Sequence, residues 1–347
     1  MPDSLSQRLQ RMIAHSGPIC VSHYMAEANA HYYATRDPLG AAGDFTTAPE
    51  ISQMFGELIG LCLADVWARA GKPEAAYVEL GPGRGTLAAD ALRAMRAAGL
   101  SPDLHLVETS PVLRSAQAER VPEAQWHHDL STLPVDRPLL VVANEFFDAL
   151  PARQLIRTAR GWHQRLVGHD GSRFVPGAGP AVPEAAIPPH LRAAPEGSVI
   201  ETSPASLAYL RLLAERLAAQ GGMALIVDYG HDRTSAGETL QAVRTHAYAD
   251  PWIEPGESDL TVHVDFEALA GAARESGVQV LGPVSQGKFL TSLGIDARLA
   301  ALSQTAPARA EEFRVARDRL VAPGEMGRLF RVLALAAPDW PVPEGLA

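Results

Sequence analysis

The sequence predicts an α/β protein with a doubly wound, mostly parallel sheet of the Rossmann-like kind. Its strand-like segments are continuous apolar runs, as expected when helices cover both faces of a sheet. From residue 76 these runs alternate with helical stretches. The first run leads through a glycine-rich turn into a helix, where such folds hold a ligand. With 347 residues and 47% hydrophobic content, the chain can bury a large core.

Residues 1–74 are expected to form an N-terminal helical segment. Its first helix has an ordinary apolar stripe with helical spacing, made by Leu5, Leu9, Met12 and Ile13. The N-terminus lacks the continuous apolar stretch of a signal peptide, which favours a cytoplasmic location.

A second, long helix is expected from Thr47 to Gly71. Thr47 and Glu50 have the spacing of a capping box, and Pro49 suits a first turn. Just before it lie Gly43, Asp44 and Phe45. We expect these three residues to close over a cofactor as a lid, with a plain loop as the alternative.

The first half of the expected sheet follows directly. Strands are expected over 76–81, 104–108 and 138–147, and helices over 86–99 and 111–120. This order of strand, helix and strand is typical of parallel sheets with crossover helices.

The second half of the sheet is predicted in the same way. A helix over 204–221 precedes a strand over 222–230, and Asp265 is expected to cap a further helix. The last two strands are expected over 278–284 and 329–336.

Two regions interrupt this alternation within residues 75–347. A segment near 168–197 is rich in Pro, Gly and Ala and is expected to be an insertion loop. Residues 285–327 look helical and are expected to form an insertion before the last strand.

The glycine turn indicates which ligand is held. Gly81, Gly83 and Gly85 form G-x-G-x-G, whereas a dinucleotide fingerprint would need its third glycine where Thr86 stands. Glu79 precedes the turn at the end of the strand. A carboxylate there would repel a pyrophosphate but attract the α-amino group of S-adenosylmethionine.

Two further acids fit the same ligand. Glu108 ends the second strand, about where an acid accepts hydrogen bonds from ribose hydroxyls. Asp129 could reach the adenine amino group or serve as a simple turn acid. The alternatives are a nicotinamide or flavin enzyme, or a turn that holds no ligand.

At this point the chain resembles the MidA family of class I S-adenosylmethionine-dependent methyltransferases, which is related to a mitochondrial complex I assembly factor. The resemblance runs from about residue 5 to residue 337. Its most specific parts are "GDFTTAPEISQMFGE" and "NEFFDALP", and it also includes "VELGPGRGTL", "HLVETSPVLR", "DYGH", "HVDF" and "EMGRLF".

This resemblance implies a seven-stranded methyltransferase sheet with an N-terminal helical extension. It also implies methylation of arginine in a protein substrate, by analogy with mitochondrial members that act on a respiratory complex I subunit. A homodimer is one state in which the chain could act. The rival functions are a methyltransferase for a small molecule or another side chain, and an assembly chaperone that binds the cofactor but acts by holding a partner.

Acidic residues that follow the apolar run "PLLVVA" are candidates for the acceptor site. Glu145 and Asp148 could hold a guanidinium, and Asn144 could accept a hydrogen bond, although all three could merely shape a turn. The neighbouring phenylalanines could wall a substrate channel or belong to the core. His263 is a candidate proton acceptor or orienting residue.

Composition excludes other classes of function. A net charge of −10 argues against a nucleic-acid-binding protein, because the phosphate backbone attracts basic surfaces. No uninterrupted apolar run approaches the length of about 20 residues that a membrane span needs. We expect no metal site, since Asp265 beside His263 is better explained as a helix cap.

Overall fold

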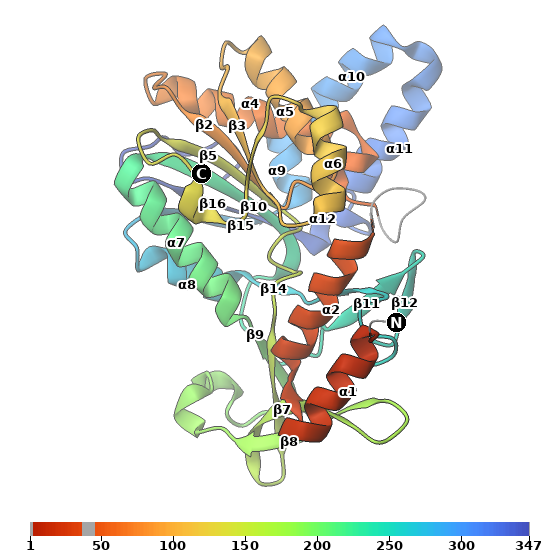
Figure 1. Cartoon of the computed structure of the whole chain (residues 1–347). Coiled ribbons are helices and arrows are strands. Elements are labelled where there is room, and N and C mark those ends of the chain that lie inside the picture. Colours follow the sequence, from red (N-terminus) through yellow and green to blue (C-terminus); the bar gives the residue numbers. More distant parts are fainter. Residues whose placement is uncertain (1–2, 37–45, 347) are drawn as a thin grey trace.

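The computed structural model describes residues 3–36 and 46–346. Within these residues its largest sheet has eight strands, in the order β15–β16–β10–β5–β2–β3–β4, with β14 pairing with β10 (Figure 1). The fold class predicted from the sequence is confirmed. The strands are β2 (Ala76–Leu80), β3 (Asp103–Val107), β4 (Gln125–His127), β5 (Leu139–Asn144), β10 (Gly222–His231), β14 (Val264–Asp265), β15 (Gln279–Ser285) and β16 (Phe330–Ala336).

Parallel pairing brings the ends of several strands to one edge of this sheet. β2 pairs in parallel with β3 and β5, so that Glu79 lies opposite Leu106 and Val142. β10 continues the parallel pairing beyond β5, and β16 is antiparallel between β10 and β15. The carboxyl ends of β2, β3, β5 and β10 therefore meet at the edge where such sheets bind ligands.

Helices cover both faces of the sheet. On one face α4 (Gln53–Arg69) and α5 (Thr86–Ala97) share a core with β2, and on the other α7 (Pro204–Gln220) and α8 (Phe266–Arg274) do the same (Figure 1). α6 (Pro111–Arg120) follows β3. Asp265 accepts a hydrogen bond from the Ala268 amide, which confirms it as the cap of α8.

The expectation of one long helix starting at Thr47 is wrong. A short helix, α3 (Ala48–Ile51), is followed by Ser52, whose backbone is extended. The Ser52 hydroxyl accepts a hydrogen bond from the Met54 amide and so caps the start of α4. The Thr47 side chain caps nothing among the described residues, and Glu50 instead accepts a hydrogen bond from the Thr86 hydroxyl. The hydrogen bond from Thr86, just after the glycine turn, thus takes the place of the predicted bond between Glu50 and the start of its own helix.

The close approach of α4 to α5 predicts an overpacking effect. A Cβ on Gly60 would lie 2.4 Å from the Ala91 carbonyl oxygen, so Gly60→Ala forces the two helices apart. We expect a loss of about 1–3 kcal/mol in the free energy of unfolding, measured by urea titration. Gly271→Ala in α8 is the matched control, because a Cβ there meets nothing within 4 Å. It should stabilise by up to about 1 kcal/mol, and equal destabilisation by both changes would contradict the packing argument.

A second region of β structure lies below the main sheet. β1 (Ile19–Cys20), β7 (Gly161–His169), β6 (Arg153–Thr158) and β9 (Val199–Thr202) form one sheet, and β8 (Phe174–Ala181) pairs with β7. A small sheet joins β12 (Ala247–Ala249), β11 (Gln241–Arg244) and β13 (Asp259–Thr261). Short 3-10 turns occupy Leu130–Thr132, Glu184–Ala186, Pro189–Leu191 and Pro307–Arg309.

The expected insertion loop near 168–197 is therefore only partly a loop, because β8 crosses it. β8 contains Pro176 and Pro180, which sequence rules treat as loop residues. Both are tolerated because β8 is an edge strand that pairs only with β7 among the described strands. β8 is a strand because it pairs with β7, and not because its own residues favour strands.

The N-terminal helices pack on this second region. α1 (Leu5–Ser16) and α2 (Val21–Thr35) bury their apolar faces against β7 and β8, and the predicted stripe of Leu5, Leu9 and Ile13 is in that core (Figure 1). α4, in contrast, packs on the main sheet. The proposed boundary between residues 74 and 75 stays a prediction.

The helical insertion before the last strand is confirmed. It consists of α9 (Gln286–Ser292), α10 (Ile295–Thr305), α11 (Ala310–Val321) and α12 (Met326–Leu329). Arg298 of α10 donates two hydrogen bonds to buried Glu57 of α4, which ties the insertion to the helical layer. Across the described residues, no helix is long and apolar enough to span a membrane.

Candidate functional site

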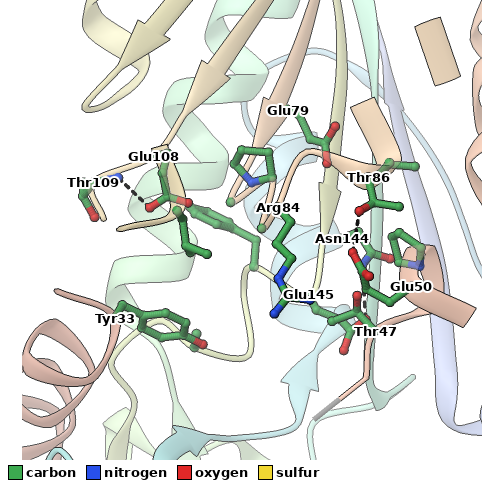
Figure 2. Close-up of a pocket in the computed structure, with 18 of the residues that line it drawn as sticks. Tyr33, Thr47, Glu50, Glu79, Arg84, Thr86, Glu108, Thr109, Asn144 and Glu145 are labelled. Atoms are coloured by element: carbon green, nitrogen blue, oxygen red, sulfur yellow. Dashed lines mark hydrogen bonds between the residues drawn. The ribbon is translucent and has the colours of Figure 1, made fainter. Parts of the chain in front are cut away.

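A cavity of about 270 Å³ opens at the carboxyl edge of the main sheet (Figure 2). Its walls are the glycine turn after β2, the ends of β3 and β5, and side chains of α2 and α3. Segments far apart in the sequence thus enclose one space, and its lining includes the sequence candidates Glu79, Gly81, Gly83, Glu108, Asn144 and Glu145.

The glycine turn has the backbone that only glycine adopts easily. Gly81, Gly83 and Gly85 have φ of 61°, 54° and 76°, in the left-handed region. A Cβ on Gly81 would also lie 3.0 Å from the Phe146 ring. The turn therefore leaves its backbone accessible to a ligand and leads the chain directly into the N-terminus of α5.

Glu79 lies at the end of β2 against this turn. Its side chain is 2% exposed and accepts a hydrogen bond of 3.2 Å from the Tyr77 hydroxyl. Burial raises the pKa of Glu79 to about 8. A ligand ammonium group would favour the ionised carboxylate, so the position suits the amino group of S-adenosylmethionine.

Glu108 lies at the opposite end of the cavity, after β3. One carboxylate oxygen, Oε1, accepts from the Thr109 amide at 2.7 Å (Figure 2) and from the Ser110 amide at 2.7 Å. The other, Oε2, lies 3.4 Å from Nε2 of Gln117. The pKa of Glu108 is raised, chiefly by burial. This fixed carboxylate fits the ribose hydroxyls, which are hydrogen-bond donors.

Sequence reasoning missed Gln117, which is fully buried and joins the two halves of this site. Its amide nitrogen donates to the Gly83 carbonyl at 2.7 Å, and its oxygen accepts from the Trp126 indole at 2.8 Å. Gln117 lies on α6 outside any motif, so its only sequence signal is a polar residue on an apolar helix face.

Two of the described cofactor candidates, Gly85 and Asp129, do not line the cavity. Asp129 is exposed and caps a 3-10 turn by accepting from the Ser131 amide at 2.7 Å. This agrees with the alternative of a turn acid. Gly43, Asp44 and Phe45 lie outside the described residues, so their expected lid role stays a prediction.

The loop after β5 forms the other wall of the cavity. Asn144 is 8% exposed, and its buried Oδ1 has no hydrogen-bond partner among the described residues. Glu145 has φ of 52°, a strained value for a residue with a side chain, and such strain clusters at functional sites. Glu145 Oε1 accepts from Asn144 Nδ2 at 3.2 Å and from the Ala48 amide at 3.4 Å.

Asp148 lies behind this wall and does not line the cavity. It is 4% exposed, and its Oδ1 lacks a partner in the described part of the chain. The Tyr229 hydroxyl donates to the Asp148 carboxylate. Burial raises the pKa of Asp148 to about 6. The acid is close enough to Glu145 to act on it electrostatically.

Asp228 of β10 fixes the loop after β5 through two backbone hydrogen bonds. Its Oδ2 accepts from the Phe147 and Asp148 amides at 3.0 and 3.2 Å, which fixes the position of the acidic loop. Of the two phenylalanines, Phe146 lines the cavity and Phe147 is in the core. The expected role as a channel wall therefore suits Phe146, and the alternative of a core residue describes Phe147.

His263 faces a different cavity of about 200 Å³ between the two β regions. Its ring packs on the Tyr229 ring, with centroids 5.5 Å apart. Burial lowers the pKa of His263 below its usual range. The histidine thus contacts Tyr229, which in turn donates to Asp148 of the acidic loop. Within residues 3–36 and 46–346, no cluster of three or more His, Cys, Asp or Glu could hold a metal ion.

Two polar residues of α2, Asn29 and Tyr33, line the cavity, and sequence reasoning did not select them. Tyr33 donates to Asp259 Oδ1 at 2.9 Å, and the Asn29 side-chain amide donates to the Ala149 and Leu260 carbonyls at 3.0 and 2.8 Å. Both link the N-terminal segment to the strands around the site. Their role depends on long-range contacts, so no local motif could have revealed it.

The buried acids predict a pH-dependent stability. Burial, followed by the charge of Asp148, raises the pKa of Glu145 from 4.5 to about 8. Between these values the folded chain binds more protons than the unfolded chain, so the free energy of unfolding falls as pH rises from about 4.5 to about 8. We expect the melting temperature to fall over this range and Glu145→Gln to make the fall shallower. Parallel melting curves for the two proteins would contradict this assignment, and Glu275→Gln, at an exposed acid, is the control.

Comparisons with known proteins agree with this geometry. The family profile "Putative S-adenosyl-L-methionine-dependent methyltransferase" matches residues 58–284. The chain is 37% identical over 376 residues to the mitochondrial protein arginine methyltransferase NDUFAF7 homolog of Drosophila melanogaster, covering 96% of this chain and 84% of the relative. It is 38% identical over 377 residues to protein arginine methyltransferase NDUFAF7 of Mus musculus, covering 95% and 83%.

Solved structures support the same relationship. A Burkholderia thailandensis protein bound to S-adenosyl-homocysteine superposes with a TM-score of 0.86 at 30% identity, over 99% of this chain and 92% of that chain. A native structure of a protein from the same organism has a TM-score of 0.82 at 31% identity over the same shares.

Proposed function

Because the chain belongs to this family of S-adenosyl-L-methionine-dependent methyltransferases, we propose that it transfers the methyl group to an arginine side chain of a protein partner. When bound, the cofactor supplies an electrophilic methyl group. The names of the relatives support arginine as the acceptor, and the acids after β5 supply the matching chemistry.

Successive residues of the cavity suit successive groups of the cofactor. Glu79 would hold the amino group, the glycine turn would allow close backbone approach, and Glu108 would accept from the ribose hydroxyls. The support lies in the buried carboxylates at both ends of the turn, with one oxygen of Glu108 already fixed by two amides.

The acceptor end is formed by Asn144 and Glu145. A guanidinium is cationic and donates hydrogen bonds in a plane, so it pairs best with a carboxylate and neighbouring amide oxygens. Glu145 lines the cavity, and Asn144 presents a buried oxygen without a partner in the described residues. Asp148 would add negative charge from behind. The buried Asn144 oxygen beside Glu145, which has no partner among the described residues, is the observation that carries this proposal.

Methylation would form a bond between the methyl carbon and a guanidinium nitrogen as the sulfur–methyl bond of the cofactor breaks, with S-adenosylhomocysteine as the leaving group, and one N–H proton must be removed. Glu145 can accept that proton at a carboxylate oxygen, because burial and Asp148 together raise its pKa to about 8. A bound guanidinium would first favour the ionised form. Glu145 would therefore serve in both binding and proton transfer.

The proposal is tested by mass spectrometry of proteins from host cells with the gene, without it, and with Glu145→Gln. We expect one methylarginine mark to disappear in both altered strains, on a protein such as a respiratory complex I subunit. A mark lost from another side chain or from a small molecule would contradict arginine as the acceptor. If no methyl mark were lost but a partner complex failed to assemble, a chaperone role would replace the proposal.

A further inference from the structure

The small sheet β12–β11–β13 presents an edge strand and two exposed apolar side chains at the surface. Tyr248 of β12 is 82% exposed, more than any other large hydrophobic side chain of the described residues, and Ile253 is 52% exposed. Among the described strands, β12 pairs with β11 alone. Exposed apolar groups beside an edge strand are typical of a surface that binds a polypeptide.

The sequence of β12 does not protect this edge. Proteins often prevent the addition of a further strand by placing proline or charged residues on an edge. The edge strand β8 contains Pro176 and Pro180, and the edge strand β15 contains Pro283. β12 reads Ala-Tyr-Ala and has neither kind of residue. Its outer edge can therefore accept another strand.

The turn between β11 and β12 determines which backbone groups face outward. Thr245 and His246 have φ of 48° and 60°, the two positive values of a type I′ turn. Such a turn makes its two flanking residues a hydrogen-bonded pair, so the next pair, Val243 and Tyr248, is not hydrogen-bonded. The backbone N–H and C=O of Tyr248 therefore point away from β11, toward the outer edge.

This edge lies close to the candidate acceptor site. Across the small sheet, Val243 lies between Tyr248 and Asp259. Asp259 accepts a hydrogen bond from Tyr33, which lines the cavity, and Figure 1 shows the small sheet beside α2. Neighbouring strands are about 4.8 Å apart, so the backbones of Tyr248 and Asp259 are about 10 Å apart. A polypeptide that pairs with β12 thus lies within a few residues of the cavity wall.

The segment that contains this edge is acidic. Residues 247–259 include four Asp or Glu and no Lys or Arg. Two of these acids pair with arginines, whereas Asp250 is exposed directly after β12. The whole chain also has a net charge of −10. This surface therefore favours a basic partner over an acidic one.

We propose that β12 binds an extended, basic segment of the protein substrate, near the arginine that is methylated, as an added strand. Main-chain hydrogen bonds with Tyr248 would align this segment, and the side chains of Tyr248 and Ile253 would contact its apolar residues. The inference rests on the proposed function, because only a polypeptide acceptor needs such a surface. It adds that contacts outside the cavity select which protein is methylated.

The test is steady-state methylation of the protein whose methylarginine mark is lost without the gene. Tyr248→Ala removes the side chain, and Tyr248→Pro removes the N–H donor as well, at an edge position that tolerates proline. We expect KM for this protein to rise about 3- to 10-fold with alanine and at least about 10-fold with proline, since a hydrogen bond is worth about 2- to 10-fold. Turnover at saturating substrate should stay within about 2-fold of wild type, because the reacting groups are untouched.

Val135→Ala is the matched control, because Val135 is 74% exposed but precedes β5, at the opposite edge of the main sheet. It should leave KM unchanged. An unchanged KM in both Tyr248 variants would overturn the docking proposal and leave arginine methylation standing. If the proline variant melts at a lower temperature than wild type, Tyr248→Ala decides alone.

The remaining outcomes separate this proposal from the proposed function and from another occupant of the edge. A methyl mark on a different side chain, with KM still raised in the variants, would overturn arginine as the acceptor and leave the docking surface. If the wild-type chain methylated no protein, both proposals would fail. Sedimentation of the chain alone tests self-association: a wild-type dimer that Tyr248→Pro dissociates would show that β12 pairs with a second copy, which overturns docking of the substrate there.

Discussion

Glu145→Gln should lower the turnover of methyl transfer by about 10- to 100-fold while cofactor affinity stays nearly constant. The substitution keeps the shape of the side chain and the oxygen that accepts from the Ala48 amide, but it removes the charge. A charge-assisted hydrogen bond contributes about 1.5–3 kcal/mol, which corresponds to this loss. Turnover is measured with a substrate identified by the lost methyl mark, and affinity by calorimetry with S-adenosylhomocysteine.

Asp148→Asn provides a graded comparison. Asp148 lies behind the cavity wall, so its loss should lower turnover less than the loss of Glu145, through the weaker electrostatic field. Glu275→Gln removes an exposed acid that pairs with Arg211 and should leave turnover unchanged. If Glu145→Gln and Asp148→Asn both left turnover intact, the acid mechanism would be wrong. If they abolished cofactor binding instead, these acids would belong to the cofactor site.

Gly83→Val should weaken the binding of S-adenosylhomocysteine by at least about 100-fold. The backbone of Gly83 has φ of 54°, a conformation that is a clear outlier for a β-branched residue. The left-handed conformation costs about 1–2 kcal/mol, and the side chain would also intrude on the turn that faces the ligand. Calorimetry measures the loss, and the melting temperature of each variant shows whether it is folded.

Gly99→Val separates ligand contact from backbone strain. Gly99 also has positive φ, at 87°, but it follows α5 away from the cavity, and a Cβ there meets nothing within 4 Å. Its variant should lose stability and keep its affinity for S-adenosylhomocysteine. Comparable affinity losses in both variants would show that strain, and not contact with the ligand, explains the Gly83 result.

The parts of the fold that were predicted correctly have strong local signals. The strands β2, β5 and β10 are continuous apolar runs, and the helix after Asp265 has both a cap and an apolar stripe. Errors occurred where distant contacts decide the structure. β8 is a strand because β7 pairs with it, and the capping box at Thr47 fails because Glu50 accepts from Thr86.

The candidate site shows the same division. Glu79, Gly81, Gly83 and Glu108 lie at or just after strand ends, where the parallel sheet must bring them together. Gln117, Tyr33 and Asn29 could not be found in this way, since they reach the site from helices through tertiary hydrogen bonds. His263 was expected at the acceptor site, but the fold places it behind Tyr229, facing another cavity. Its direct role in proton transfer stays a prediction.

The sequence by itself determined the sheet, the glycine turn and the acids that follow β2, β3 and β5. Apolar periodicity and glycine backbone freedom act over a few residues, so they can be recognised locally. Only the tertiary structure decided which acids share one cavity, which become buried, and which charges face each other. Burial raises the pKa of Glu79 and Glu145 to about 8, and it depends on segments that lie far away in the chain. Asp129, with a similar side chain, is exposed and caps a turn, because no described segment covers it.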